Sequence, residues 1–279
     1  MKAPLSLLCA GLLAGAVNTA LATVEETVEW EEVFPVSAGA ELSVRNVWGP
    51  VNITRGPAGA ITVRAVETRS APNQTLFERS KSILYVHLEN SDELVKLAIG
   101  DQDHKQRWRR DNPCRGCKLE IAYTIEVPTD TLVSAATVND GGIVIKELPG
   151  PINAENINGP VTITGLHACS DIQNINGEVR LTFATAPDLP CEIETINGDI
   201  NISLPQGAGL DVLADLGNGD LRTSLHPEAL PVAAKLTEER EGRKTSYRVT
   251  QAAGIRLGPG GHPFTIRSMN GDVRINPVK

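Results

Sequence analysis

The sequence predicts an all-β protein: a single-domain β-solenoid, similar to a parallel β-helix, with about 18–21 residues per coil. An Asn-Gly turn followed by an alternating apolar strand recurs along the chain, and the turns return at nearly constant intervals. Gly (25) and Pro (18) are frequent and only 4% of residues are aromatic, so the core must be aliphatic. An antiparallel sandwich is the alternative, because Asn-Gly also forms hairpin turns. Hairpins, however, do not explain a single such turn per period.

A secretory signal peptide is predicted at residues 1–22, MKAPLSLLCAGLLAGAVNTALA. Lys2 precedes an apolar run, and Ala20-Leu21-Ala22 forms a small-x-small cleavage site. The mature domain, residues 23–279, has no apolar segment near the roughly 20 residues that a membrane helix needs. We therefore expect an exported protein without a transmembrane segment, located in the periplasm, secreted or at the cell surface.

The net charge of −8 and the pI of about 5.2 make nucleic acid a poor candidate partner. Binding of nucleic acid usually requires a basic face.

The repeated motif defines the corners of the predicted coils. A loose copy lies around Gly141, and the following turn glycines are spaced by 18, 18, 21, 21 and 52 residues. Asn and Gly tolerate the positive φ of a sharp corner, and we expect Asn158, Asn176, Asn197 and Asn218 to stack in chain order. The predicted turn residues are Asn158, Gly159, Asn176, Gly177, Asn197, Gly198, Asn218, Gly219, Asn270 and Gly271.

The remaining segments are assigned by their patterns. Further alternating strands precede the repeats, as in ELSVRNVWGPVNI and KLEIAYTIEVP. A polar loop is expected near residues 100–117. An insertion near 227–262 interrupts the repeats and is expected to cap or decorate the last coils, because the ends of a solenoid must be covered.

The order ELSVRNVWGPVNI, LEIAYTIEVPTDTLVSAATVNDGGIVI and then serial INGxVxI units resembles the bacterial putative-adhesin family of β-strand-repeat envelope proteins. More distantly, it is similar to adhesin head domains with Gly-Ile-Asn repeats. The resemblance covers most of residues 28–225 and the final coil. It implies an adhesin-like β-solenoid exposed to the periplasm or the cell surface, with no catalytic residues to carry over.

Acidic residues follow the turn glycines, at Glu178, Asp199, Asp220 and Asp272. A column of the first three could bind Ca²⁺ through several oxygens. Arginines two residues further on, at 180, 222 and 274, favour a solvated surface instead. No metal site and no cofactor are predicted.

The four mature cysteines are even in number, which favours disulfides in an exported protein. Cys169 and Cys191 occupy matching points of consecutive coils and are expected to form a staple between them. For Cys114 and Cys117, in CRGC, a local disulfide is the first expectation. A metal site and a redox-active pair are the alternatives.

One basic concentration stands out near the CRGC motif. It comprises Lys105, Arg107, Trp108, Arg109, Arg110 and Arg115. Such a group could contact an anionic glycan, lipid headgroups or an acidic protein of the envelope, or it could be a mobile charged loop without a partner.

The main functional hypothesis is a non-catalytic envelope protein with an adhesin-like binding or scaffolding role. One alternative is a carbohydrate-active β-helix enzyme, a polysaccharide lyase or hydrolase, with Asp199, Asp220 and Arg222 in catalytic roles. Another is a thiol-based envelope stress factor.

Overall fold

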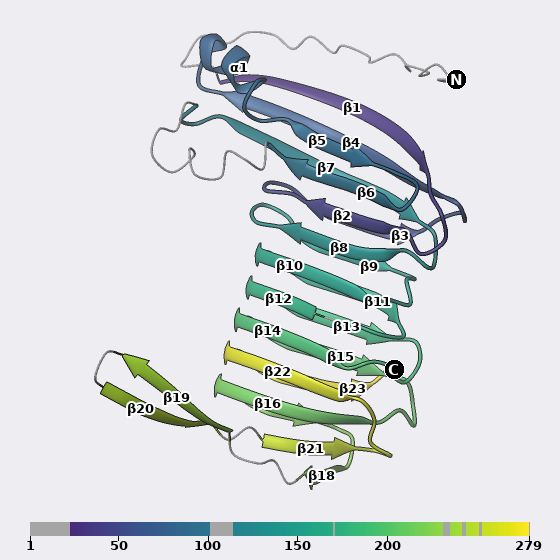
Figure 1. Ribbon diagram of the computed structural model, residues 1–279, viewed down its shortest axis with the longest axis vertical. Coiled ribbons are helices and arrows are strands. Elements are labelled where there is room, and N and C mark those ends of the chain that lie inside the picture. Colours follow the sequence, from purple (N-terminus) through teal and green to yellow (C-terminus); the bar gives the residue numbers. More distant parts are fainter. Residues whose placement is uncertain are drawn as a thin grey trace.

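The computed structural model describes residues 23–100, 114–169, 171–230, 235–241, 244–250 and 253–278. These residues form two large, mainly parallel β-sheets, a separate two-stranded sheet and a short helix, α1 (Gln74–Ser80). The two large sheets run side by side along the long axis of the molecule (Figure 1).

The first sheet has ten strands. In spatial order they are β1 (Val24–Pro35), β4 (Ala60–Ala71), β7 (Lys118–Val127), β3 (Val51–Arg55), β9 (Ile143–Lys146), β11 (Val161–Leu166), β13 (Val179–Phe183), β15 (Ile200–Leu204), β23 (Val273–Pro277) and β17 (Leu221–Thr223).

The second sheet has eleven strands. In spatial order they are β5 (Val86–Asn90), β6 (Leu94–Ile99), β2 (Glu41–Arg45), β8 (Leu132–Thr137), β10 (Ile152–Asn158), β12 (Asp171–Asn176), β14 (Cys191–Asn197), β22 (Pro263–Asn270), β16 (Leu210–Asn218), β21 (Ala253–Leu257) and β18 (Pro227–Leu230). The separate hairpin, β19 (Lys235–Glu241) and β20 (Lys244–Thr250), projects from the body near β18 and β21.

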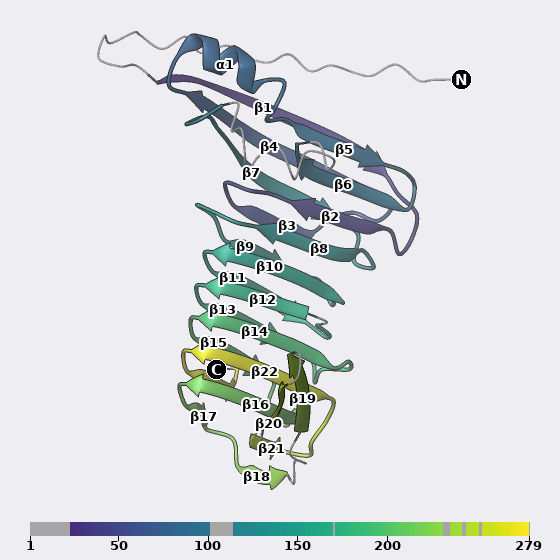
Figure 2. The same cartoon turned by 60° about the vertical axis from the view of Figure 1, so that its left-hand side comes forward.

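The middle of both sheets is parallel and both ends are antiparallel. Pairing is parallel from β7 to β17 in the first sheet and from β6 to β16 in the second. At one end β4 pairs antiparallel with both β1 and β7, and β5 pairs antiparallel with β6. At the other end β21 and β18 cover β16 in the same way (Figure 2). The segment near 227–262 thus contributes antiparallel strands at the edge of the second sheet.

The parallel middle includes six units that we call corner repeats, and β2–β3 precedes them with a similar corner at Gly49. Each is a strand of the second sheet, a sharp corner and a strand of the first sheet: β8–β9, β10–β11, β12–β13, β14–β15, β22–β23 and β16–β17. Inward residues form aliphatic ladders between the sheets. Val161, Val179, Ile200 and Val273 share one such level and are fully buried. Burying a side chain of this size contributes about 1.5–3 kcal/mol, so the ladders account for much of the driving force for stacking.

The stacking order of the corner repeats differs from their order in the chain. The sequence suggested that the repeat at Gly219 follows the one at Gly198. Instead β22–β23, from the end of the chain, lies between β14–β15 and β16–β17 (Figures 1 and 2).

The inward residues explain this order. In β23, Val273 and Ile275 are buried, whereas the equivalent positions of β17 are Leu221 and Thr223, both half exposed. A Thr hydroxyl is better tolerated at the edge of the first sheet, where water reaches it, than in its interior.

The corners require glycine for two reasons. Gly177 has φ +146°, a conformation that L-residues rarely adopt, and a Cβ placed on it would lie 2.2 Å from the carbonyl oxygen of Gly159. At Gly198 the corresponding distance to the Gly177 oxygen is 1.9 Å. Each corner glycine thus sits directly against the backbone of the corner before it.

A Gly177→Ala substitution should therefore lower the free energy of unfolding by about 3 kcal/mol, because it combines backbone strain with overpacking. The matched control is Gly39→Ala, where φ is +75° and nothing lies within 4 Å of the added Cβ. Urea unfolding of both variants is the measurement. Equal losses at the two sites would show that corner stacking does not restrict the side chain.

The inserted repeat can be tested by cross-linking. Ser203 pairs with Asn276, and Ser224 lies on the far side of that strand, where its backbone N donates to Asn276 Oδ1 at 3.1 Å. Oxidised S203C/N276C should form a disulfide, because adjacent strands are about 4.8 Å apart. S203C/S224C should not, because two strand spacings exceed the limit of about 7 Å for Cα atoms. Peptide mass mapping distinguishes the two, and an intramolecular disulfide in S203C/S224C would support stacking in chain order.

Candidate binding face

A continuous column of asparagine side chains runs along the outside of the corners. Its six members, in stacking order, are Asn139, Asn158, Asn176, Asn197, Asn270 and Asn218. Each Nδ2 donates to the Oδ1 of the preceding asparagine, at 2.9 Å in four steps and 3.0 Å in the last. Amide ladders of this kind stabilise in-register stacks of parallel strands. The column confirms the insertion of the last repeat, since Asn270 links Asn197 to Asn218.

A second set of polar side chains lies inside the corners. Asn156 and Asn174 are each 2% exposed. Asn174 Nδ2 donates to the carbonyl oxygens of Gly159 at 3.2 Å and Gly177 at 2.9 Å, so it ties two successive corners together. In the motif N-x-N-G the first asparagine is therefore a buried cross-link between backbones, and the second belongs to the outer column.

The acidic residues after the corner glycines are held by arginines on the outer face of the first sheet. Arg274 donates from Nη1 to Asp199 at 2.6 Å and from Nη2 to Asp272 at 2.8 Å. Arg222 contacts Asp220 at 3.0 Å and Asp272 at 3.5 Å. The hydrogen bond from Arg274, together with one from the Asp272 backbone, lowers the pKa of Asp199.

This geometry bears on the enzyme hypothesis. Asp199 and Asp220 belong to corner repeats separated by the inserted one, and Asp272 stands between them. A glycoside hydrolase needs a general acid with a raised pKa, whereas the pKa of Asp199 is lowered. The arrangement keeps Asp199 ionised and paired.

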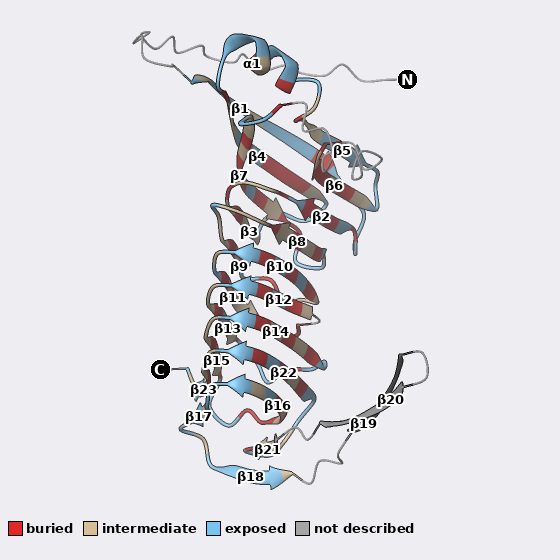
Figure 3. Ribbon diagram, turned by 90° about the vertical axis from the view of Figure 1, so that its left-hand side faces the viewer, coloured by how far each residue is buried: buried red, intermediate tan, exposed pale blue. Residues whose placement is uncertain are grey.

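The outer face of the second sheet carries a row of exposed aliphatic residues beside the asparagine column. This row, which we call the apolar stripe, consists of Ile157 (38% exposed), Ile175 (37%), Ile196 (40%) and Met269 (59%). Its members lie on neighbouring strands, because the flanking residues are paired in register. In Figure 3 the corresponding ends of β10, β12, β14 and β22 form an exposed column.

The apolar stripe was not predicted from the sequence, although the motif contains a signal for it. The residue between the two polar positions of the motif is apolar in four copies: NIN, NIN, TIN and SMN. Side chains alternate between the two faces of a strand. The polar residue before this position is buried inside the corner, so the apolar residue points outward.

Acidic side chains share this outward face with the apolar stripe. Glu155, Glu194 and the basic Arg267 lie in the row two residues before the stripe, and Asp171 and Glu192 lie one row further out. Arg267 forms ion pairs with both Glu192 and Glu194. The central part of this face therefore combines an apolar row with an excess of negative charge.

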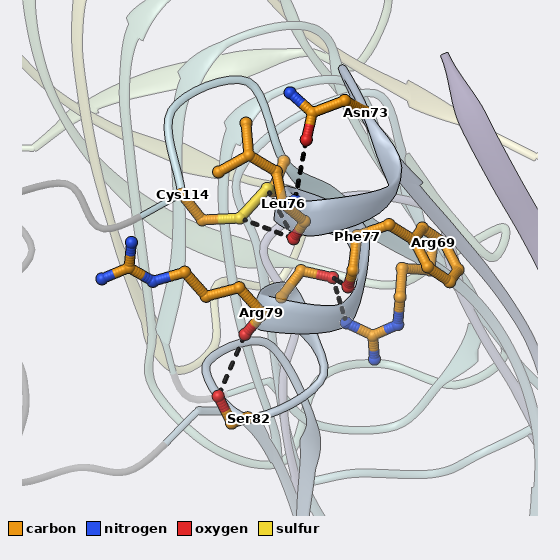
Figure 4. Close-up of a disulfide and its surroundings, with 9 residues drawn as sticks. Arg69, Asn73, Leu76, Phe77, Arg79, Ser82 and Cys114 are labelled. Carbon is orange, nitrogen blue, oxygen red and sulfur yellow. Dashed lines mark hydrogen bonds between the residues drawn. A yellow bond between two sulfur atoms is a disulfide. The ribbon is translucent and has the colours of Figure 1, made fainter. Parts of the chain in front are cut away.

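The CRGC cysteines form a disulfide against helix α1 (Figure 4). The carbonyl oxygen of Leu76 lies 3.3 Å from Cys114 Sγ and 3.6 Å from Cys117 Sγ. Asn73 caps this helix by accepting from the Leu76 N–H at 2.9 Å. A carbonyl oxygen beside the sulfurs disfavours a thiolate, and Cys114 is buried. Neither feature matches the electropositive, accessible surroundings of reactive cysteines.

The other two cysteines also form a disulfide. Cys169 and Cys191 are 22 positions apart in the sequence and both are buried: Cys191 begins β14, and Cys169 lies two residues before the neighbouring strand β12. This bond connects consecutive corner repeats, and closing a loop of this size contributes about 3 kcal/mol in the chain-entropy model.

Most of the predicted basic contact lies outside the described residues. The structure does not describe Lys105, Arg107, Trp108, Arg109 or Arg110. Arg115 is described, and it is exposed next to the Cys114–Cys117 disulfide. Lys118, on the other side of that disulfide, contacts Glu120 and Asp140, each at 2.8 Å.

Two further observations concern the described part of the chain. It contains no helix long and apolar enough to cross a bilayer. Among the same residues, no group of three or more His, Cys, Asp or Glu side chains is placed to hold a metal ion.

Comparison with known proteins finds similarity at the level of structure. No family model and no curated protein matches the sequence. The chain is similar to a putative cell adhesion protein from Clostridium sporogenes, with 12% identity and a TM-score of 0.45 over 90% of this chain and 100% of that one. A putative adhesin from Bacteroides fragilis shows 12% identity and a TM-score of 0.33 over 90% and 97% of the two chains.

A putative lipid binding protein from Parabacteroides distasonis is also similar, with 13% identity and a TM-score of 0.29 over 90% of this chain and 97% of that one. The structural similarity to bacterial putative adhesins agrees with the resemblance noted in the sequence. At these identities and TM-scores it carries no information about function.

The lowered pKa of Asp199 predicts a specific acid sensitivity. A carboxyl group with a pKa below its unfolded value, about 3.9, stabilises the fold above that pH, and the contribution is lost as the pH falls through the folded pKa. The free energy of unfolding should thus fall more steeply below about pH 4 in the wild type than in Asp199→Asn.

Urea unfolding between pH 7 and pH 3 is the measurement. The control is Glu155→Gln, which removes an exposed carboxylate from the other sheet and should leave the wild-type slope in place. Parallel pH profiles for wild type and Asp199→Asn would contradict the assignment.

Proposed function

We propose that this protein is a non-catalytic, exported β-solenoid of the cell envelope that acts by binding or scaffolding, in the periplasm or at the cell surface. One observation carries the proposal: six corner repeats stack in parallel register, so that equivalent side chains form straight rows on the outer faces. Stacked repeats of this kind create extended binding surfaces in other architectures.

The state of the polar groups supports binding over catalysis. The aspartates after the corners form ion pairs with Arg274 and Arg222, and the outer asparagines form hydrogen bonds with one another. These groups rigidify the surface. A polysaccharide lyase or hydrolase would need charged groups held free for the substrate.

The sequence supplies a candidate contact near the CRGC motif. The basic residues between Lys105 and Arg110, with Arg115 beside the Cys114–Cys117 disulfide, are suited to an anionic glycan or an acidic protein. The overall negative charge makes this concentration the exception in the chain, which is why we propose it as the envelope contact.

The proposal predicts that the purified mature protein co-sediments with isolated envelope fractions and that R107S/R109S/R110S reduces the bound fraction at least tenfold. The control R45S/R79S/K146S removes the same charge from exposed positions elsewhere and should bind like the wild type. Equal binding by the two triple variants would show that the basic segment is not the envelope contact. If the wild type itself fails to sediment, the envelope-binding function is wrong, and polysaccharide cleavage becomes the assay of choice.

A further inference from the structure

We propose that the apolar stripe and the acidic residues beside it bind a cationic amphipathic α-helix of a partner protein, lying along the stack and across the strands. The inference deepens the proposed binding role and rests on it, but it concerns different residues from the basic segment. The stripe is distinguished by its exposure, its spacing and its charge.

Exposure first distinguishes the stripe from ordinary surface. Ten large apolar side chains are exposed in the described part of the chain, and four of them form this one straight row. Strand formation does not require them, because the outward position of the first sheet beside the corner holds Arg180, Asn201 and Arg274 on neighbouring strands. Scattered exposed apolar residues need no explanation, whereas an ordered row of them indicates an interaction surface.

Spacing identifies the kind of partner. Neighbouring strands lie about 4.8 Å apart, so the four stripe residues span about 14 Å. An α-helix places one residue per turn on a given face every 5.4 Å or so. Over three intervals the two repeats differ by about 2 Å, which side chains can absorb. An extended strand repeats about every 6.6 Å and would be out of step by more than 5 Å over the same distance.

Charge identifies the chemistry of the helix. Glu155 and Glu194 lie in the row beside the stripe, Asp171 and Glu192 lie one row further out, and Arg267 offsets one of these four charges. A helix with an apolar row and lysines or arginines beside it is complementary to this surface. A second copy of the same acidic face would be repelled, and so would an anionic membrane.

The first test uses a 21-residue peptide of Leu, Lys and Ala with leucine at positions a and d of each heptad, titrated by calorimetry into the mature protein. We expect micromolar binding that weakens as salt is raised. The same peptide with Glu in place of Lys should bind at least tenfold more weakly. Equal binding of the two peptides would overturn the charge argument and with it the proposal.

Variants then locate the site. I175T/I196T should weaken peptide binding at least tenfold, because it removes the two central apolar contacts while keeping β-branched residues in the strands. The control V33T/V66T replaces exposed valines of β1 and β4 and should change binding less than twofold. Circular dichroism and urea unfolding verify that both variants are folded. Equal affinities of the two variants would overturn the proposal.

Two other occupants are outcomes of the same experiment. Self-association that disappears in I175T/I196T would assign the stripe to a second copy, and stripe-dependent binding to phosphatidylglycerol vesicles would assign it to a membrane. Either result overturns the proposal. Envelope sedimentation of the wild type separates the two levels: if the peptide does not bind while the wild type still sediments, the helix site is wrong and the envelope role stands. If the wild type does not sediment but the peptide binds at the stripe, the envelope role is wrong and the helix site stands.

Discussion

The close approach of backbones at the corners is the constraint on which the rest of this structure depends. Gly177 lies against the carbonyl oxygen of Gly159, and the same contact recurs at Gly198. Because no side chain intervenes, the strands on both sides of each corner stay at the spacing of hydrogen-bonded strands. A side chain at these positions would separate the corners and thereby loosen both sheets at once.

The regular spacing converts a short sequence motif into continuous surfaces. Within N-x-N-G, the first asparagine cross-links backbones inside the corner, as Asn174 does, and the second joins the outer column. The residue between them faces outward, and in four repeats it is Ile157, Ile175, Ile196 or Met269. The four positions of the N-x-N-G motif therefore determine both the stability of the stack and the composition of the outer face that it presents.

Local features of this fold could be predicted from the sequence, whereas the order of the repeats could not. Alternation and Asn-Gly turns fix where a strand points and where it ends, so a mainly β structure with corner turns follows from the residues themselves. Every repeat presents almost the same edge to its neighbours, however, so the motif alone does not choose between them. The choice depends on single inward residues, such as Thr223 against Ile275, and on the antiparallel strands that close each end. The outward direction of the stripe residues follows from strand alternation, whereas their alignment in one row depends on the order in which the repeats stack.

The position of β22–β23 separates the order of synthesis from the order of assembly. Residues 263–277, which a ribosome makes after β16–β17, occupy an internal place in the stack, between β14–β15 and β16–β17. The strands of β16–β17 therefore cannot take their final neighbours until this later segment has emerged. A stack that grew in the order of the chain would halt at β15 until β22–β23 was made. Frameshifts and truncations that remove β22–β23 accordingly strike the interior of the stack, although in most elongated repeat proteins the repeats made later lie nearer the tip.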